Sequence, residues 1–110
     1  MEPAMDPAAA PHLLTEPAAA AAAEVMQGLA SPVRIRILAR LLHAPCSVGD
    51  LADDLDLGQP TVSNHLRLLR HLDLVTGRRD GRSVVYELHD AHVGDLLRQV
   101  LAHVHHAPGA

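Results

Sequence analysis

Residues 47–75 have the sequence SVGDLADDLDLGQPTVSNHLRLLRHLDLV, and this stretch decides the fold. Ser47 can cap a short helix with apolar residues on one face, and the turn at 56–58, Asp-Leu-Gly, stops that helix. Pro60 then opens a second helix, in which apolar residues recur every third or fourth position from Val62 to Leu72. The spacing therefore predicts two short helices joined by a tight turn.

A β-hairpin signal follows these helices at once. Residues 74–76 and 83–88 are rich in strand-forming residues, and between them the turn around Arg78–Arg82 contains Asp80-Gly81. Two short helices followed directly by a two-stranded ribbon form a winged helix-turn-helix.

Three further helices surround this unit in the sequence. An alanine-rich helix is expected to start after Pro17 and to end near Leu29. Ser31-Pro32 marks the cap and first turn of a second helix that runs to about His43. Asp90 can cap a last helix over 91–106. The prediction is a mainly α fold with a small β-hairpin, in the order α-α-α-α-β-β-α.

Length and composition are those of one small domain. We expect residues 1–16 to form a disordered arm, 17–106 a single domain and 107–110 a short tail. Tyr86 is the only aromatic residue, so the core must be aliphatic and no platform exists for stacking single-stranded bases. The lone Cys46 forbids an internal disulfide and indicates a reducing compartment. We expect a cytoplasmic protein with no membrane partner.

The charge of the chain is unevenly distributed. The net charge is −4, with nine Arg and no Lys, yet residues 59–82 carry +3, from five Arg against two Asp. This basic window coincides with the second helix of the predicted helix-turn-helix and with the ribbon, which indicates a double-stranded DNA partner.

The second helix of the helix-turn-helix has a polar face opposite Val62. Short polar groups and one Arg on this face are suited to reading base edges in a major groove, while arginines at the ribbon tip suit the DNA backbone. The candidate DNA-binding residues are Gln59, Pro60, Thr61, Ser63, Asn64, Arg67, Arg78, Arg79 and Arg82. The alternative is a merely solvated helix face and a soluble hairpin tip. An enzyme is not expected, because no phosphate-binding loop or nucleophile motif is present.

The last helix carries candidate metal ligands at both ends. Asp90 and His92 lie at its start, and His103 and His106 lie at its end along one edge of the apolar stripe. About 16 Å of helix separates His92 from His103, whereas ligands of one ion lie within about 4 Å of each other. One copy of the helix therefore cannot close a metal site.

An antiparallel second copy would place one chain's Asp90 and His92 beside the other chain's His103 and His106. The apolar stripe of the helix favours such a homodimer, with two equivalent sites. One carboxylate and three imidazoles suit Zn(II) or Co(II), and Ni(II) if His105, His12 or the amino terminus adds ligands. The alternatives are that Asp90 is only a cap and that the C-terminal histidines only complement the helix dipole.

Four segments together resemble the ArsR/SmtB family of metal-sensing winged-helix regulators. They are LASPVRIRILARLL, SVGDLADDLDLGQPTVSNHLRLLRHLDLV, RRDGRSVVYEL and DAHVGDLLRQVLAHVHH, within residues 24–106. The resemblance implies a metal site formed by Asp90, His92, His103 and His106 across a dimer of the first and last helices. It also implies that metal loosens DNA binding, and that the protein is most similar to nickel- and cobalt-responsive actinobacterial members with N-terminal tails that add ligands.

The sequence departs from one pattern of this family. Members that sense arsenic, cadmium or lead carry cysteines at the positions of Ser47 and Gly49, and Cys46 is one residue out of register. A soft-metal thiolate site is therefore not expected.

These observations favour a nickel-responsive regulator that binds an inverted-repeat operator as a homodimer, with the metal modulating DNA affinity. Three alternatives stay open: a zinc- or cobalt-responsive regulator of the same fold, a metal-buffering or protein-interaction dimer without sequence-specific DNA binding, and a complex that includes a second regulatory protein.

Overall fold

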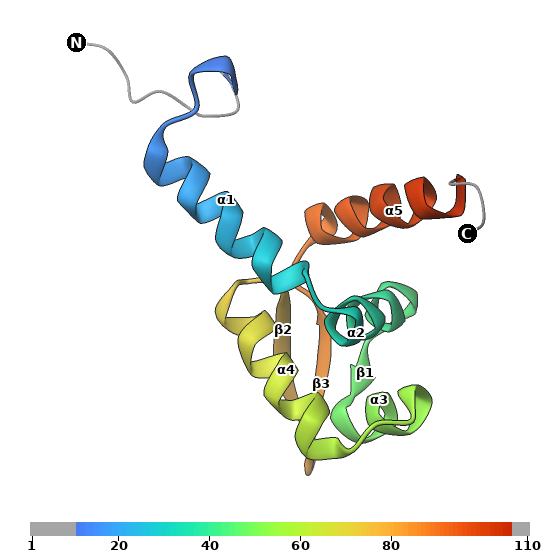
Figure 1. Ribbon diagram of the computed structural model, residues 1–110. Coiled ribbons are helices and arrows are strands. Elements are labelled where there is room, and N and C mark those ends of the chain that lie inside the picture. The colour runs from blue at the N-terminus through green and yellow to red at the C-terminus, as the bar shows by residue number, and fades with distance from the viewer. Residues whose placement is uncertain (1–10, 107–110) are drawn as a thin grey trace.

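The computed structural model describes residues 11–106 of the chain and confirms the predicted winged helix-turn-helix. In chain order its elements are the 3-10 turn η1 (Pro11–Leu13), α1 (Glu16–Leu29), α2 (Pro32–His43), β1 (Cys46–Ser47), α3 (Val48–Leu55), α4 (Gln59–His71), β2 (Val75–Asp80), β3 (Ser83–Leu88) and α5 (Ala91–His106). In Figure 1, α2, α3 and α4 gather beside the sheet, and α1 and α5 both project from one end of this body. No helix within residues 11–106 is long and apolar enough to span a bilayer.

One aliphatic core joins the helices to the sheet. Its buried members are Ile37, Leu38, Leu41, Cys46, Leu51, Ala52, Val62, Leu66, Leu69, Leu74, Val75, Val93 and Leu97. The face of α4 that the sequence assigns to the interior is confirmed, because Val62, Leu66 and Leu69 are all 0% exposed. No polar side chain of the described residues is buried, so burial of aliphatic surface is the main stabilising term.

Capping residues fix where the two helices of the helix-turn-helix, α3 and α4, begin and where α3 ends. The Ser47 hydroxyl accepts a hydrogen bond from the Asp50 N–H at 3.1 Å and starts α3. Asp56 ends α3 with a φ of 55°, a left-handed conformation that Asp tolerates better than most residues. Gly58 then caps α4, with Pro60 in its first turn. The polar face of α4 is thereby turned outward.

The sheet differs from the predicted two-stranded ribbon in two ways. First, β1 pairs with β3 through Cys46 and Tyr86, giving the antiparallel order β1-β3-β2. A two-residue strand is too short to show alternation and forms only because β3 offers it a free edge. Second, the turn is confined to Gly81 and Arg82, whereas the sequence predicts a turn beginning at Arg78.

Close packing of the hairpin depends on a glycine opposite the only aromatic ring. Gly77 faces Tyr86 across the two strands, and a Cβ at Gly77 would lie 2.9 Å from Cε1 of Tyr86. A side chain at position 77 would therefore displace the ring, which packs against the core.

The N-terminal segment is partly described. Within the predicted disordered arm 1–16, Pro11–Leu13 form one 3-10 turn, while residues 1–10 lie outside the described residues, as does the tail 107–110. α1 begins at Glu16, two residues before the start expected after Pro17, because the Thr15 hydroxyl accepts from the Ala18 N–H at 3.2 Å.

We predict that Gly77→Ala lowers the free energy of unfolding by about 1–3 kcal/mol, because the added methyl overpacks the Tyr86 ring. Urea unfolding followed by circular dichroism measures the change. Gly49→Ala is the matched control: its Cβ would meet only the Gln59 side chain at 3.8 Å, and alanine favours the helix there. Equal stability of Gly77→Ala and the wild type would contradict the packing account.

Candidate functional site

The polar face of α4 is open to solvent as the sequence predicts. Gln59, Pro60, Thr61, Asn64 and Arg67 are exposed and Ser63 is half-buried. Nη1 of Arg67 donates to Oδ1 of Asn64 at 3.3 Å, so this pair is oriented along the helix surface. No side chain caps the N-terminus of α4, which leaves its first-turn N–H groups available to an anion such as a phosphate.

The three ribbon arginines are exposed but do not form one cluster. Arg82 lies in the two-residue turn, whereas Arg78 and Arg79 are consecutive residues of β2 and so project from opposite faces of the sheet. Arg79 pairs with Val84 on the face that also carries buried Val75, so Arg79 lies on the helix side of the ribbon. The sequence placed all three at the tip because it predicted too wide a turn.

A hollow of about 410 Å³ joins the ribbon to the helix-turn-helix. It brings Gln59 of α4 and Arg82 of the turn to one place, beside Ser47, Gly49 and Asp50 at the start of α3. Sequence reasoning missed this contribution of α3, because the hollow joins residues that are distant in sequence and that only the tertiary fold brings together.

The arginines of α2 are used inside the fold. Nη2 of Arg36 donates to the carbonyl of Leu55 at 3.0 Å, and Nε of Arg40 donates to Oδ2 of Asp54 at 2.9 Å. The hydrogen bond that Arg40 donates to Asp54 raises the pKa of Arg40. These residues therefore hold α3 on α2, while the basic side chains of the window 59–82 stay on the surface.

At the start of α5, two candidate metal ligands already lie together. Oδ1 of Asp90 accepts from the N–H groups of His92 and Val93, at 2.9 and 3.3 Å, and caps the helix. Nδ1 of His92 lies 3.3 Å from the same oxygen, and the His92 side chain is 94% exposed. The second carboxylate oxygen of Asp90 makes no hydrogen bond within residues 11–106, so capping and metal ligation are compatible.

The Asp90 carboxyl is held in its ionised form. Partial desolvation acts to raise its pKa, but the hydrogen bonds from the His92 side chain and from two backbone N–H groups outweigh it, so the pKa lies below its ordinary value. An ionised carboxylate is the form that binds a metal ion and that suits a helix N-terminus.

The other candidate ligands are not brought to this pair within one chain. His103 is exposed near the opposite end of α5, and His105 and His12 are exposed as well, while the His106 side chain lies outside the described residues. Among the side chains that the structure describes, no three of His, Cys, Asp or Glu lie together as a metal site.

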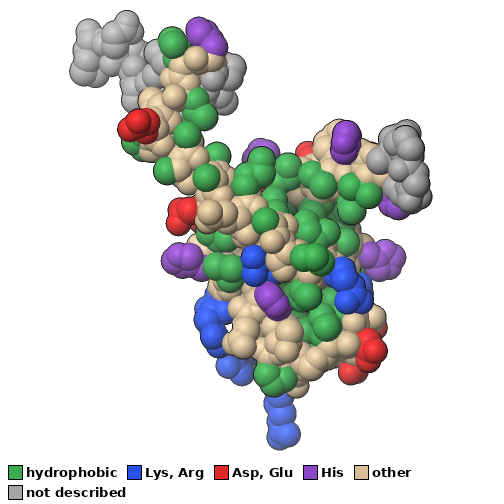
Figure 2. All heavy atoms as spheres, in the orientation of Figure 1, with side chains coloured by type: hydrophobic (Ala, Val, Ile, Leu, Met, Phe, Trp, Pro, Cys, Tyr) green, Lys and Arg blue, Asp and Glu red, His purple; other side chains and the backbone are tan. Residues whose placement is uncertain are grey.

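The apolar stripe of α5 is only half covered. Val93 and Leu97 are buried against the body, whereas Val100 and Val104 are 43% and 49% exposed. On α1, Met26 is 65% exposed. Figure 2 shows hydrophobic side chains gathered between these two projecting helices.

Cys46 is not a reactive thiol in this fold. It is 5% exposed within β1, and burial raises the pKa of its thiol. Its neighbour Ser47 uses its hydroxyl as the α3 cap. Both observations make Cys46 a poor candidate for a thiolate ligand.

Comparison with known proteins points to one group. A family model described as "Bacterial regulatory protein, arsR family" matches residues 31–76. The chain is 46% identical over 93 residues to the HTH-type transcriptional regulator NmtR of Mycobacterium tuberculosis, covering 84% of this chain and 78% of that protein. It is 42% identical to the HTH-type transcriptional repressor SmtB of the same species, covering 76% of this chain and 62% of that protein.

Solved structures agree with the sequence relatives. The solution structure of apo-NmtR superposes with a TM-score of 0.77 at 40% identity, covering all of this chain (100%) and 87% of that one. HlyU from Vibrio cholerae superposes with a TM-score of 0.73 at 32% identity, covering 78% of this chain and 94% of that one.

We predict that Asp90→Asn lowers the melting temperature of the metal-free protein at pH 7, because the cap loses its charge. A carboxyl with a lowered folded-state pKa stabilises the fold above its unfolded pKa, and this contribution is lost as the pH falls through the folded pKa. The difference between wild type and Asp90→Asn should therefore shrink below about pH 4. Thermal unfolding at pH 7 and pH 3 tests this, and a difference that does not change with pH would refute it.

Proposed function

The chain belongs to the arsR family of bacterial regulatory proteins, and we propose that it is a nickel-responsive regulator that binds an inverted-repeat operator as a homodimer. As a member of this family it is a DNA-binding transcription regulator and not an enzyme. The proposal concerns the operator, the metal, the dimer and its action in the cytoplasm.

The exposed polar face of α4 supports the operator proposal. Gln59, Asn64 and Arg67 are the base-reading candidates, since Gln and Asn pair with adenine and Arg with guanine in a major groove. Arg82, together with Arg78 and Arg79 on the two faces of β2, would neutralise phosphates beside it. The remaining members of the proposed interface are Pro60, Thr61 and Ser63.

The observation that carries the metal proposal is the Asp90–His92 pair at the start of α5. The pair is preassembled, exposed and followed along the same helix by uncovered aliphatic residues. Two antiparallel copies of α5 would add the partner chain's C-terminal histidines to each pair and form two equivalent sites. We assign Asp90, His92, His103 and His106 as ligands.

The metal is proposed from the donor set. Three imidazoles and one carboxylate hold Zn(II) or Co(II) with four ligands, and these metals are the alternatives. Ni(II) is favoured if His105, His12 or the amino terminus raises the coordination number. The metal would supply cross-links between the two chains, and so change the spacing of the two α4 helices and weaken operator binding.

Two other outcomes remain distinct from this proposal. A metal-buffering dimer would bind metal without preferring any duplex. A complex with a second regulatory protein finds no support among the relatives or the structural neighbours.

For DNA, we predict that Asn64→Ala and Arg67→Ala reduce the preference for the chain's own promoter duplex over random DNA by about 1–3 kcal/mol. Arg82→Ala should weaken binding to both duplexes by the same factor. It should also reduce the slope of log K against log salt concentration by about one. Fluorescence anisotropy at two salt concentrations measures both effects. Arg98→Ala is the control, since Arg98 pairs with Asp95 on α5. No duplex preference in the wild type would favour the buffering alternative.

For the metal, we predict that His92→Ala and His103→Ala each abolish high-affinity Ni(II) binding and leave the dimer intact. The control is His43→Ala, at the exposed C-terminal end of α2. Competition against a chromophoric chelator gives affinity and stoichiometry, and sedimentation gives the oligomeric state. Unchanged stoichiometry and affinity in either variant would overturn the assigned ligand set.

A further inference from the structure

The C-terminal end of α1 rests directly on the end of α4. Gly28 of α1 is buried, and a Cβ at this position would overlap Cδ1 of Leu72, the C-cap residue of α4. A displacement of α1 at this point therefore presses on the helix that carries the base-reading residues.

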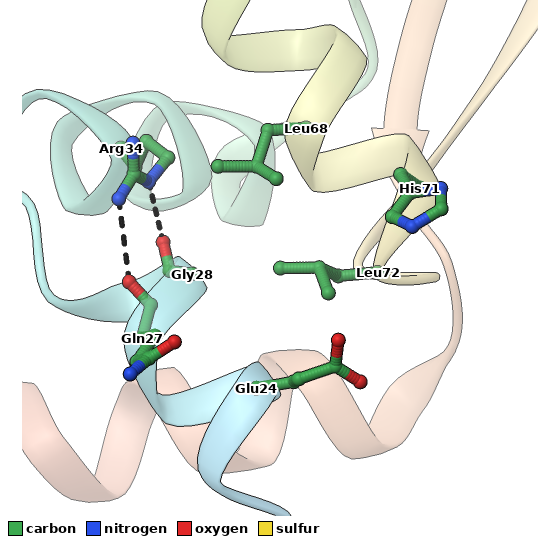
Figure 3. Close-up of a pocket in the computed structure, with 7 residues that line it drawn as sticks. All are labelled: Glu24, Gln27, Gly28, Arg34, Leu68, His71 and Leu72. Atoms are coloured by element: carbon green, nitrogen blue, oxygen red, sulfur yellow. Dashed lines mark hydrogen bonds between the residues drawn. The ribbon is translucent and has the colours of Figure 1, made fainter. Parts of the chain in front are cut away.

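One guanidinium joins the two helices through hydrogen bonds. From α2, Nε of Arg34 donates to the Gly28 carbonyl at 2.6 Å, and Nη2 donates to the Gln27 carbonyl at 3.3 Å (Figure 3). Nη1 of the same side chain lies 3.4 Å from Nδ1 of His65 in α4. Because Arg has no acceptor, Nδ1 of His65 is the acceptor in this contact.

A cavity lies between α1 and α4 beside this contact. A cavity of about 310 Å³ separates Glu24 and Gln27 of α1 from Leu68 and His71 of α4. In Figure 3 these side chains surround an open space, with Arg34 on one side. Within residues 11–106, Arg34 makes the only side-chain hydrogen bonds between α1 and another helix. The polar connection is thus concentrated in one residue.

We propose that Arg34 is the positioning residue that passes a movement of α1 to α4, and so couples metal binding to operator binding. The inference rests on the proposed function, in which α1 and α5 form the dimer and metal changes its geometry. Arg34 contacts both the carbonyl end of α1 and the middle of α4, so the two helices move as one unit when metal changes the dimer. Without the Arg34 side chain, α1 would still move when metal binds, but α4 would keep the position that it has in the metal-free protein.

The test measures coupling instead of either affinity alone. The quantity is the ratio of operator Kd with saturating Ni(II) to operator Kd without metal, for the full chain. We expect a wild-type ratio of about five or more. Arg34→Ala and His65→Leu should each reduce this ratio by about threefold or more. Ni(II) affinity and the dimer should stay unchanged.

Two controls separate positioning from general destabilisation. His65→Asn places an amide oxygen where Nδ1 lies and should keep the wild-type ratio. Arg36→Ala removes a similar guanidinium that binds the Leu55 carbonyl of α3 instead, and should lower the melting temperature while keeping the ratio. His65→Leu keeps the test valid if Arg34→Ala does not fold.

The outcomes are distinguishable. A wild-type ratio of one overturns the proposed function, and this inference falls with it. A wild-type ratio well above one that persists in both Arg34→Ala and His65→Leu overturns this inference alone. An equal loss in Arg36→Ala also overturns it, since the loss would then follow stability and not the connection between α1 and α4.

Discussion

The packing of one half of α5 on the body is the interaction on which the rest of the structure depends. Val93 and Leu97 are buried, which fixes Asp90 and His92 relative to the helix-turn-helix. The other half leaves Val100 and Val104 uncovered and carries His103 away from the first pair. The two ends of one helix cannot meet, so under the proposed ligand set α5 would need a second chain to complete each site. Metal binding would then be linked to assembly of the dimer.

The arginines are divided between scaffold and surface. Those of α2 satisfy carbonyl groups and one carboxylate within the fold, as Arg36 and Arg40 do for α3. Those of α4 and the ribbon lie on the surface of an otherwise acidic chain. This division lets a protein with a net charge of −4 present a basic face to DNA, and it gives α2 the role of connecting the elements that would bind metal to those that would read the operator.

Most of the fold was predictable because its signals are local. Ser31, Ser47 and Asp90 each cap the helix that the sequence assigns to them, and the face of α4 follows from its apolar spacing. The features that were missed depend on contacts between distant segments: β1 exists only beside β3, and the bond between Arg34 and His65 joins residues far apart in sequence. For the proposed metal site, the spacing indicates residues that share a helix edge, but the site as proposed also needs a second copy, which no single-chain pattern contains.

The most direct test of the account is a mixing experiment with two defective chains. His92→Ala removes the first half of every site and His103→Ala removes the second half, so neither homodimer should bind Ni(II) tightly. In the mixed dimer both defects fall in one site, and the other site is complete. After random exchange of subunits, about half of the dimers are mixed, and each mixed dimer has one complete site out of two. The mixture should therefore bind about a quarter of the Ni(II) that the wild type binds tightly. A mixture that binds no more Ni(II) than the separate variants would contradict a metal site shared between two chains.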